Sequence, residues 1–396
     1  MTPSATRVGS CNASALRVAH VVGKMLGGGV EAVVMNYYRH IDRDKVQFDF
    51  IVDGDSRLVP KCEIEYLGGR VFEVPPYQKL PAYMKALGDL LERERWQVVH
   101  SHINALSVFP LGAAKRVGVP VRIAHSHSTG GKGEWAKNAL KALLRTQANR
   151  YPTHRFACSE HAGTWLFGNE VDFVIVRNAF EVGEFAFDGT SRNCVRNELG
   201  LTRSQRVIGH IGRFMAQKNH AFLLHVFAEL TKRRSDVVLV LVGEGPLRPL
   251  IENMAIEYGI STRVRFLGQR GDVKRLYQAF DAFVLPSLYE GLGLVGIEAQ
   301  AAGLPCVFSD AIPREVSLTS KCRFLGIKKT DVSLWADALE EAIEAPRPVA
   351  DASLLEAYDI DKAARLLEDL YLDVCMPEAA SHQKQIGECQ GGWRNA

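Results

Sequence analysis

The chain has 396 residues, of which 47% are hydrophobic and 23% charged, values that are ordinary for a soluble globular protein. This length is too great for one core and suits two α/β domains. The formal net charge of +3 is too small to favour a nucleic acid as partner, because such binding normally needs a concentrated basic face.

The first half of the chain predicts one α/β domain. Residues 1–15 are mostly small or polar, so we expect a disordered N-terminus that is not a signal peptide. Short apolar runs then alternate with amphipathic, helix-like stretches. The strand-like runs are Leu16–Val22, Phe48–Val52, Val71–Val74, Gln97–His100, Val121–His125, Arg155–Cys158 and Phe173–Val176. Strands that alternate with helices predict a parallel sheet covered on both faces, here over residues 16–190.

The second half repeats this pattern. Residues Val182–Thr202 are polar and charged, and we interpret them as an interdomain linker. The later strand-like runs are Val207–Ile211, Val237–Val242, Val264–Leu267, Ala282–Leu285 and Cys306–Phe308. They predict a second domain over residues 191–355, a helix over 356–375 that packs back on the first domain, and a loose tail over 376–396. The expected fold class is α/β, with two Rossmann-like doubly wound domains that face each other across a cleft.

A glycine-bearing turn follows the fourth strand of the second domain. The segment Pro286–Glu298 runs from that strand through the turn into a helix. Gly291 and Gly293 allow a ligand to approach the backbone closely, and the free amides of Leu294 and Val295 at the helix start are suited to hold a phosphate. The segment therefore predicts a nucleotide-diphosphate site.

Two carboxylates flank this turn. Glu298, about one turn inside the helix, is placed to accept hydrogen bonds from ribose hydroxyls, and Glu290 is placed to reach hydroxyls of a sugar beyond the phosphates. From spacing alone, two solvated acids beside a glycine turn are an equally good interpretation.

The segment resembles the donor-site signature of family-4 glycosyltransferases. The motif reads Glu290-Gly291-Leu292-Gly293 and continues to Glu298, with seven residues between the two acids. It is most similar to the branch that builds capsular and exopolysaccharides, and the resemblance extends from about Arg17 to Leu372. It implies the GT-B fold, retaining chemistry that needs no metal or other cofactor, and a nucleotide-sugar donor, most often a UDP-sugar in this branch. Gly293 and Gly296 depart from the family pattern, so the donor sugar stays open.

Cationic residues follow the first strand of the second domain. Gly212, Arg213 and Lys218 resemble the family segment Gly-Arg-x-x-x-x-Lys, which implies that the two cations hold the donor diphosphate. Fixed cations lower the barrier to departure of a diphosphate. In isolation, a loop with two surface cations explains this segment as well. Gly243 and Glu244, beyond the next strand, are expected to form the cleft wall near the base.

Glycines and histidines mark the first domain. In the family, Gly28, Gly29 and Glu31 match residues that line the cleft against the diphosphate and the acceptor. His125 matches the family's active-site histidine and is expected to contact the transferred sugar on the acceptor side, with His102 supporting the same wall. Two His-Ser-His triplets also invite a metal-site interpretation, which we reject because no acid or cysteine accompanies them at ligand spacing.

The stretch Trp135–Arg150 predicts an amphipathic helix with cations beside an apolar stripe. Such a helix suits peripheral contact with an anionic membrane, and equally suits packing against the sheet. No apolar run is long enough to cross a bilayer, and eight scattered cysteines without C-x-x-C spacing predict reduced thiols in a cytoplasmic protein.

We therefore expect a retaining glycosyltransferase that uses a nucleotide-sugar donor and a saccharide or lipid-linked saccharide acceptor at the cytoplasmic face of the membrane. A nucleotide-sugar 2-epimerase on the same fold and an inactive nucleotide-sugar-binding protein are the alternatives. An epimerase would convert the donor without any acceptor.

Overall fold

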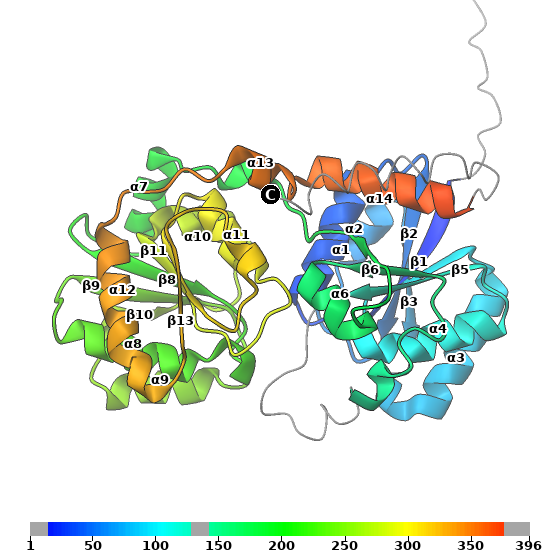
Figure 1. Cartoon of the computed structure of the whole chain (residues 1–396), viewed down its shortest axis with the longest axis horizontal. Helices are drawn as coiled ribbons and strands as arrows, with labels where there is room; N and C mark the ends of the chain where they lie inside the picture. Colours follow the sequence, from blue (N-terminus) through cyan, green and yellow to red (C-terminus); the bar gives the residue numbers. More distant parts are fainter. Residues whose placement is uncertain (1–14, 128–141, 376–396) are drawn as a thin grey trace, which may run out of the picture.

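The computed structural model describes residues 15–127 and 142–375, which form two α/β domains side by side (Figure 1). The first domain contains seven parallel strands in the order β3-β2-β1-β4-β5-β6-β7. The strands are β1 (Leu16–Gly23), β2 (Val46–Asp53), β3 (Arg70–Val74), β4 (Val98–Ser101), β5 (Val121–Ser126), β6 (His154–Ala157) and β7 (Val174–Ile175). The parallel sheet expected from the apolar runs is thereby confirmed.

Helices cover both faces of this sheet. They are α1 (Gly29–His40), α2 (Lys61–Tyr66), α3 (Leu80–Glu94), α4 (Val108–Arg116) and α6 (Glu160–Phe167). One apolar cluster joins the sheet to α1 and to the last helix of the chain, α14 (Ile360–Cys375). Another joins the opposite face to α3, α4 and α6. Burial of both sheet faces explains why its strands are continuous apolar runs rather than alternating ones.

The second domain repeats this design with six parallel strands in the order β10-β9-β8-β11-β12-β13. Its strands are β8 (Arg206–Ile211), β9 (Val237–Val242), β10 (Val264–Phe266), β11 (Ala282–Leu285), β12 (Cys306–Ser309) and β13 (Cys322–Leu325). Its helices are α7 (Gly189–Glu198), α8 (His220–Thr231), α9 (Arg248–Glu257), α10 (Val273–Ala279), α11 (Leu294–Ala301) and α12 (Val332–Glu344). The sequence analysis missed β13, a half-exposed edge strand that contains a charged residue, Arg323.

Each sheet has one place where the strand order reverses. It lies between β1 and β4 in the first domain and between β8 and β11 in the second. The loops after such a strand pair diverge to opposite faces of the sheet and leave a crevice, which is where ligands bind in open parallel sheets. The topology therefore directs attention to the loops that follow these four strands.

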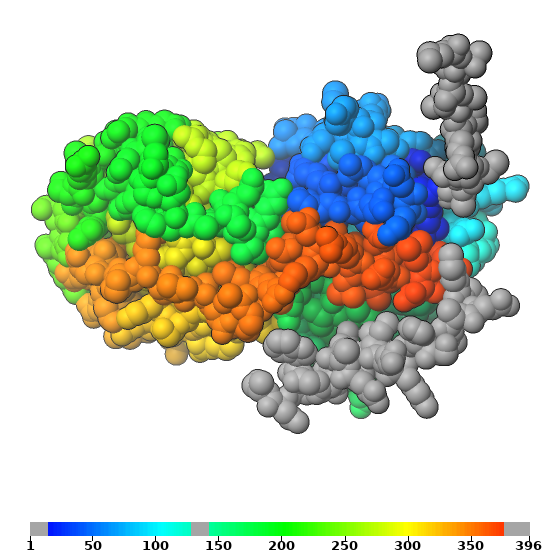
Figure 2. Space-filling view, turned by 90° about the horizontal axis from the view of Figure 1, so that it is seen from above, coloured from blue at the N-terminus to red at the C-terminus, as the bar shows by residue number. Residues whose placement is uncertain are grey.

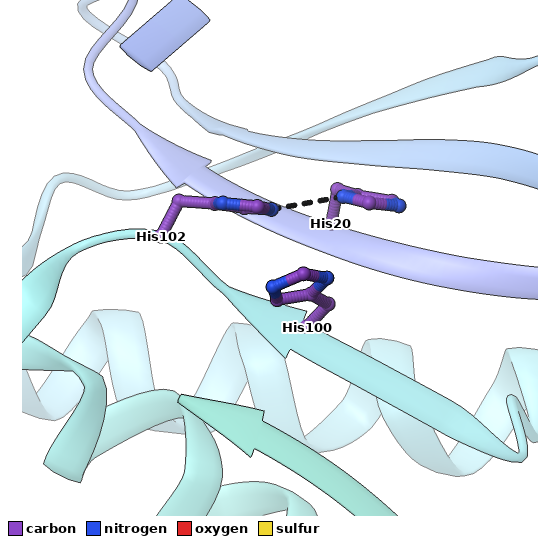
Figure 3. Close-up of side chains that lie close together, drawn as sticks. All are labelled: His20, His100 and His102. Atoms are coloured by element: carbon purple, nitrogen blue, oxygen red, sulfur yellow. Dashed lines mark hydrogen bonds between the residues drawn. The ribbon is translucent and has the colours of Figure 1, made fainter. Parts of the chain in front are cut away.

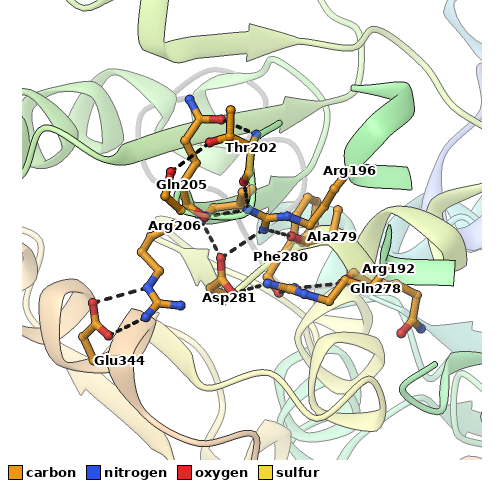
Figure 4. Close-up of polar contacts among 12 residues, drawn as sticks. Arg192, Arg196, Thr202, Gln205, Arg206, Gln278, Ala279, Phe280, Asp281 and Glu344 are labelled. Carbon is orange, nitrogen blue, oxygen red and sulfur yellow. Dashed lines mark hydrogen bonds and ion pairs between the residues drawn. The ribbon is translucent and has the colours of Figure 1, made fainter. Parts of the chain in front are cut away.

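The linker expected over Val182–Thr202 is wrong in its second part, because α7 forms there and packs on α10. Asp188 caps the helix by accepting hydrogen bonds from the amides of Thr190 (3.0 Å) and Ser191 (2.9 Å). Arg192 and Arg196, one helical turn apart, both pair with Asp281, the residue before β11, at 2.6 and 3.4 Å (Figure 4). The arginines that made the stretch appear exposed and polar therefore fasten it to the second domain.

The chain crosses between the domains twice, and the two crossings are hydrogen-bonded to each other. The amide of Phe180 donates to the carbonyl of Tyr358 (3.0 Å), and the amide of Ile360 donates to the carbonyl of Phe180 (3.1 Å). After the second crossing, which contains α13 (Ala352–Glu356), helix α14 lies along the first domain (Figures 1 and 2). Glu368 of α14 pairs there with Lys45 at 2.7 Å. None of the helices in the described residues is long and apolar enough to span a bilayer.

Candidate functional site

At the crevice of the second domain, the loop after β8 and the loop after β11 are joined by direct hydrogen bonds. The amide of Leu288 donates to the carbonyl of Gln217 (2.8 Å), and the ammonium of Lys218 donates to the carboxylate of Glu290 (2.7 Å). Both charged side chains are largely buried, with 15% and 9% of their surface exposed. The structure therefore brings together two residues that the sequence assigned separately to the phosphates and to the sugar.

Gln217 is a site residue that the sequence analysis missed. Its side-chain amide donates to Glu290 at 3.2 Å and to the carbonyl of Tyr289 at 3.0 Å. Gln217 thus fixes the second oxygen of the carboxylate that Lys218 already holds. The only sign of this role in the sequence is that Gln217 stands next to Lys218. The role becomes clear when the loop after β11 is seen to face it.

Arg213 differs from Lys218 in its surroundings. It follows β8 and is exposed, and within residues 15–127 and 142–375 its guanidinium has no hydrogen-bond or ion-pair partner. A guanidinium presents donors in a fixed fork that matches phosphate oxygens. Arg213 is therefore available to an anion as it stands, whereas Lys218 must share its charge with Glu290.

Glycines allow the backbones of these loops to approach each other. At Gly243 φ is +138°, and a Cβ atom there would lie 2.2 Å from the carbonyl oxygen of Gly212. Any side chain at residue 243 would force the loops after β8 and β9 apart. The adjacent Glu244 is exposed and forms an ion pair with Arg248.

The start of α11 supplies backbone donors. Gly293 caps this helix with φ of +86°, a left-handed conformation that favours glycine, and Leu294 and Val295 begin the helix. Amides in a first helical turn have no partner inside the helix and attract anions. Just before them, Leu292 is buried, and the carbonyl of Gly291 accepts a hydrogen bond from Ser159 of the first domain (2.9 Å). The turn is therefore held in place by the hydrogen bond to Gly291 and by the burial of Leu292.

Glu298 lies deeper in the same helix. Its carboxylate accepts a hydrogen bond from the Tyr277 hydroxyl (2.8 Å), which also lies 3.0 Å from the carbonyl of Val295. Although part of the residue remains accessible, burial raises the pKa of its carboxyl to about 7, and the hydrogen bond from Tyr277 and the charge of Lys218 partly offset this rise. Tyr277 is a second residue that the sequence analysis did not assign to the site.

In the first domain, the glycine loop after β1 faces the second domain. A Cβ atom at Gly27 would lie 2.4 Å from the side-chain nitrogen of Gln269, which belongs to the second domain. Glu31 accepts hydrogen bonds from the amides of Leu26 (3.0 Å) and Gly28 (2.7 Å). Glu31 therefore holds the loop of Gly28 and the exposed Gly29 in shape with both of its oxygens.

Five buried histidines lie on the sheet face toward α1 and α14, and they form two hydrogen-bonded rows. The first row joins His20, His102, His127 and Asn178 at 2.9, 2.9 and 3.3 Å. The second joins Tyr371, His100 and His125 at 2.6 and 3.1 Å. Figure 3 shows His20 bonded across to His102, with His100 beside them. His20 and Tyr371 were not expected from the sequence.

Burial keeps these imidazoles neutral. It lowers the pKa of His20 to about 3 and that of His127 to about 4. Burial and the neighbouring rings also lower the pKa values of His100, His102 and His125 well below the ordinary value. His125 is only 2% exposed and lies inside β5, so His127 is the first histidine beyond the end of that strand.

The geometry of the imidazole rings shows whether their nitrogens could coordinate one metal ion. Two sets of three nitrogens lie within 4.8 Å of one another, from His20, His100 and His102 and from His102, His125 and His127. However, His20 and His102 are nearly coplanar (9°), as are His100 and His125 (11°), and each pair of ring centroids is 5.2 Å apart. Those separations place each N···N contact on the line between the centroids. In each pair one nitrogen therefore donates its N–H to the lone pair of the other. A zinc site would instead need the lone pairs to be directed at one common point.

Residues 135–141 of the helix expected over Trp135–Arg150 lie outside the described residues. Within its described part, Leu144 and Ala148 are buried in the apolar cluster beneath α3 and α4, while Leu143 is 66% exposed. At least this end of the stretch packs on the domain.

Two family models match the chain in the order of its domains. The model described as "Glycosyl transferase 4-like domain" matches residues 28–178, and the one described as "Glycosyl transferases group 1" matches residues 191–373. A putative glycosyltransferase of Bacillus subtilis, EpsF, is 37% identical over 346 residues, which covers 85% of this chain and 90% of the relative. A UDP-Gal:alpha-D-GlcNAc-diphosphoundecaprenol alpha-1,3-galactosyltransferase of Escherichia coli is 24% identical over 384 residues, with 91% and 98% covered.

Solved structures resemble the fold. The Anabaena protein Alr3699/HepE in complex with UDP and glucose aligns with a TM-score of 0.75 at 17% identity, covering 90% of this chain and all of that one. A sucrose-phosphate synthase of Thermosynechococcus elongatus aligns with a TM-score of 0.75 at 19% identity, covering 92% of this chain and all of that one. At these identities the likeness concerns the arrangement of the two domains and not the ligands.

Proposed function

Because the chain belongs to the family-4 glycosyltransferases and has their GT-B fold, we propose that it is a retaining enzyme that uses a UDP-sugar donor. The sugar would pass to a saccharide or lipid-linked saccharide in cell-surface polysaccharide synthesis. Two names support these choices: the B. subtilis relative is called EpsF, and the E. coli relative is named as a UDP-galactose transferase that acts on a diphosphoundecaprenol-linked sugar.

The observation that carries the proposal is the convergence of two cations, the start of α11 and two carboxylates at one crevice. In the proposed donor complex, Arg213 and Lys218 bind the diphosphate together with the amides of Leu294 and Val295. Glu298 accepts hydrogen bonds from the ribose hydroxyls, and Glu290 accepts them from the sugar. Each group lies where the loops after β8 and β11 meet, as described above.

The chemistry follows from this placement. The bond between the anomeric carbon and the diphosphate oxygen breaks, and negative charge develops on that oxygen. Preorganised cations stabilise this charge more in the transition state than in the donor, so no metal is needed to lower the barrier. The acceptor oxygen attacks from the face that the diphosphate leaves, and the departing phosphate takes the acceptor proton. The close approach of the glycine loop to Gln269 would exclude water and limit donor hydrolysis.

The Lys218–Glu290 ion pair has a part in this proposal. In this pair, Glu290 neutralises the cation that the diphosphate needs. Donor binding would let Lys218 turn part of its charge to phosphate while Glu290 turns to the sugar hydroxyls. The pair therefore keeps both charged groups in the crevice before the donor binds, because each charge compensates the other where both are largely buried.

Nucleotide binding and product stereochemistry test the proposal. Isothermal titration with UDP, ADP and GDP is expected to show tightest binding of UDP, and Glu298→Ala is expected to weaken it at least tenfold. NMR of the product should show the anomeric configuration of the donor. Conversion of the donor sugar without an acceptor would support the epimerase alternative, and an inverted product would disprove the retaining mechanism.

We further propose that the enzyme works at the inner face of the plasma membrane, with the stretch Trp135–Arg150 in contact with anionic lipid through the part before Leu144, because Leu144 and Ala148 pack on the domain. The basis is the sequence pattern of cations beside an apolar stripe. Vesicle flotation tests it: replacement of Lys137, Lys141 and Arg145 by Glu should abolish binding to phosphatidylglycerol vesicles. Unchanged flotation of that variant would disprove the membrane contact.

A further inference from the structure

One serine hydroxyl joins the first domain to the glycine turn of the second. Ser159 follows β6 and precedes α6, which lies at the boundary between the domains (Figure 1). Its Oγ atom accepts a hydrogen bond from the amide of Ala162 (3.1 Å) and donates its own proton to the carbonyl of Gly291 (2.9 Å). Ser159 is fully buried. The hydroxyl therefore makes one bond inside the first domain and one across the boundary.

Capping of α6 explains only the first of these bonds. A serine before a helix accepts a hydrogen bond from an amide of the first turn, and this leaves its own proton unused. In the second domain, Asp188 caps α7 by accepting from the amides of Thr190 and Ser191, and a carboxylate has no proton to donate. A cap therefore does not need a donor, and the bond from Ser159 to Gly291 calls for a separate explanation.

Other contacts hold α6 against the second domain at the same place. The carboxylate of Glu315 accepts a hydrogen bond from the amide of His161 (3.4 Å), at the end of α6 where a helix favours negative charge. Ala162 is buried in the same apolar cluster as Leu292 of the glycine turn. The bond from Ser159 thus belongs to a packed contact between the domains, with polar and apolar parts.

The bond across the boundary fixes the peptide unit between Gly291 and Leu292. The carbonyl and the amide of a trans peptide unit point in opposite directions. Because the carbonyl is held toward α6, the amide of Leu292 is directed away from the first domain. Without this bond, Gly291 would let the unit rotate with little steric resistance. Leu294 and Val295, whose amides are the proposed phosphate donors, follow directly after this turn.

We propose that Ser159 is a positioning residue for the donor crevice, whose hydroxyl keeps the turn Glu290–Gly293 in the shape that receives a nucleotide diphosphate. It acts through the carbonyl of Gly291 and only while the two domains are in contact. A donor that binds this shape of the turn therefore also favours contact between the domains, since such coupling is reciprocal. The identity of the ligand rests on the proposed function, whereas the coupling itself can be measured without a ligand.

Hydrogen–deuterium exchange of the ligand-free chain tests the coupling. Ser159→Gly removes the hydroxyl and keeps a residue that is tolerated at an N-cap. We expect the amides of residues 296–299, in the other domain, to exchange about fivefold faster in this variant, the effect of one ordinary buried hydrogen bond. Asp188→Gly is the matched control, because it also replaces an N-cap by glycine and should leave exchange at 296–299 unchanged. Equal exchange at 296–299 in Ser159→Gly and wild type would overturn the proposal.

Isothermal titration with UDP tests the link to the donor. Ser159→Gly should raise the Kd for UDP about fivefold for the same reason, whereas Asp188→Gly should bind UDP like wild type. Ser159→Thr restores a hydroxyl and should return the Kd and the exchange toward the wild-type values. Wild-type affinity of Ser159→Gly for UDP, or a loss of affinity as large in Asp188→Gly, would refute the role in donor binding. A wild-type chain that binds no UDP would instead reject the proposed function and leave the exchange result standing.

Discussion

The two domains share one topology but differ in how their crevices handle charge. In the second domain, charged groups meet across the switch point: Lys218 pairs with Glu290, Arg213 is exposed and unpaired among the described residues, and Glu298 is held by Tyr277. In the first domain, the corresponding strands carry neutral imidazoles joined in rows. The same architecture thus supports an electrostatic site on one side and a rigid, uncharged scaffold on the other.

The difference teaches that the crevice position fixes where a ligand can bind, while the side chains decide which chemistry is available. A departing diphosphate needs fixed positive charge, which the second domain supplies. An acceptor alcohol is neutral, and a crevice that binds it benefits from hydrogen-bonding groups held in fixed directions. Five buried histidines with lowered pKa values lie in the first domain, against His210 and His220 in the second, so the contrast also predicts that acid destabilises the first domain more.

The largest expected effect is acid unfolding of the first domain. The histidines of the two rows have lowered pKa values in the folded chain. Below about pH 6.5 the unfolded chain therefore binds more protons than the folded chain, and the free energy of unfolding decreases as the pH decreases. Each such histidine lowers the free energy of unfolding by about 1.4 kcal/mol for each pH unit below that value. Together they should unfold the first domain before the second, near pH 5.

Pulse proteolysis with mass-spectrometric readout follows the two domains separately and checks this order. His127→Gln should reduce the pH slope of the first domain by about one proton, whereas His225→Gln, in the second domain, should leave it unchanged. If the second domain unfolded first in acid, the contrast drawn here would be wrong.

The next largest effect concerns catalysis. Lys218→Ala should lower turnover by a factor on the order of 10² or more, because it removes a cation from the proposed diphosphate site and leaves Glu290 without its counterion. Steady-state kinetics with a UDP-sugar measures this loss. Lys232→Ala is the control, since that lysine pairs with Glu229 at an exposed position. Near-normal turnover of Lys218→Ala would refute the role assigned to this residue.

These features differ in how far the sequence predicts them. The apolar runs predict both sheets, and the motifs around Glu290 and Lys218 predict two segments of the crevice, because strand burial and close backbone approach leave local patterns. The bond from Gln217 to Glu290 and the bond from Tyr371 to His100 join positions far apart in the chain, and no local pattern encodes them. Helix α7 was missed for a related reason: Arg192 appears solvated until Asp281 is known to face it.

The smallest expected effect lies in the second domain and has the opposite sign. The pKa of Glu298 is raised from 4.5 to about 7, so the folded chain retains a proton that the unfolded chain releases between those values. Stability contributed by this group is therefore lost as pH rises through that window, by an amount on the order of 1 kcal/mol per pH unit.

Glu298→Gln removes this titration while it preserves the shape of the side chain and a hydrogen-bond acceptor for Tyr277. The variant should be more stable than wild type at pH 8, and the difference should vanish near pH 5, in denaturant unfolding of the second domain followed at Trp335, which is buried there. Glu252→Gln, at an exposed ion pair with Arg248, should show no such dependence. A Glu298→Gln variant that is less stable at pH 8 would mean that the carboxylate is ionised and well solvated in the folded chain. The crevice of the second domain would then be more polar than its burial indicates, and its cations would stabilise a developing negative charge less.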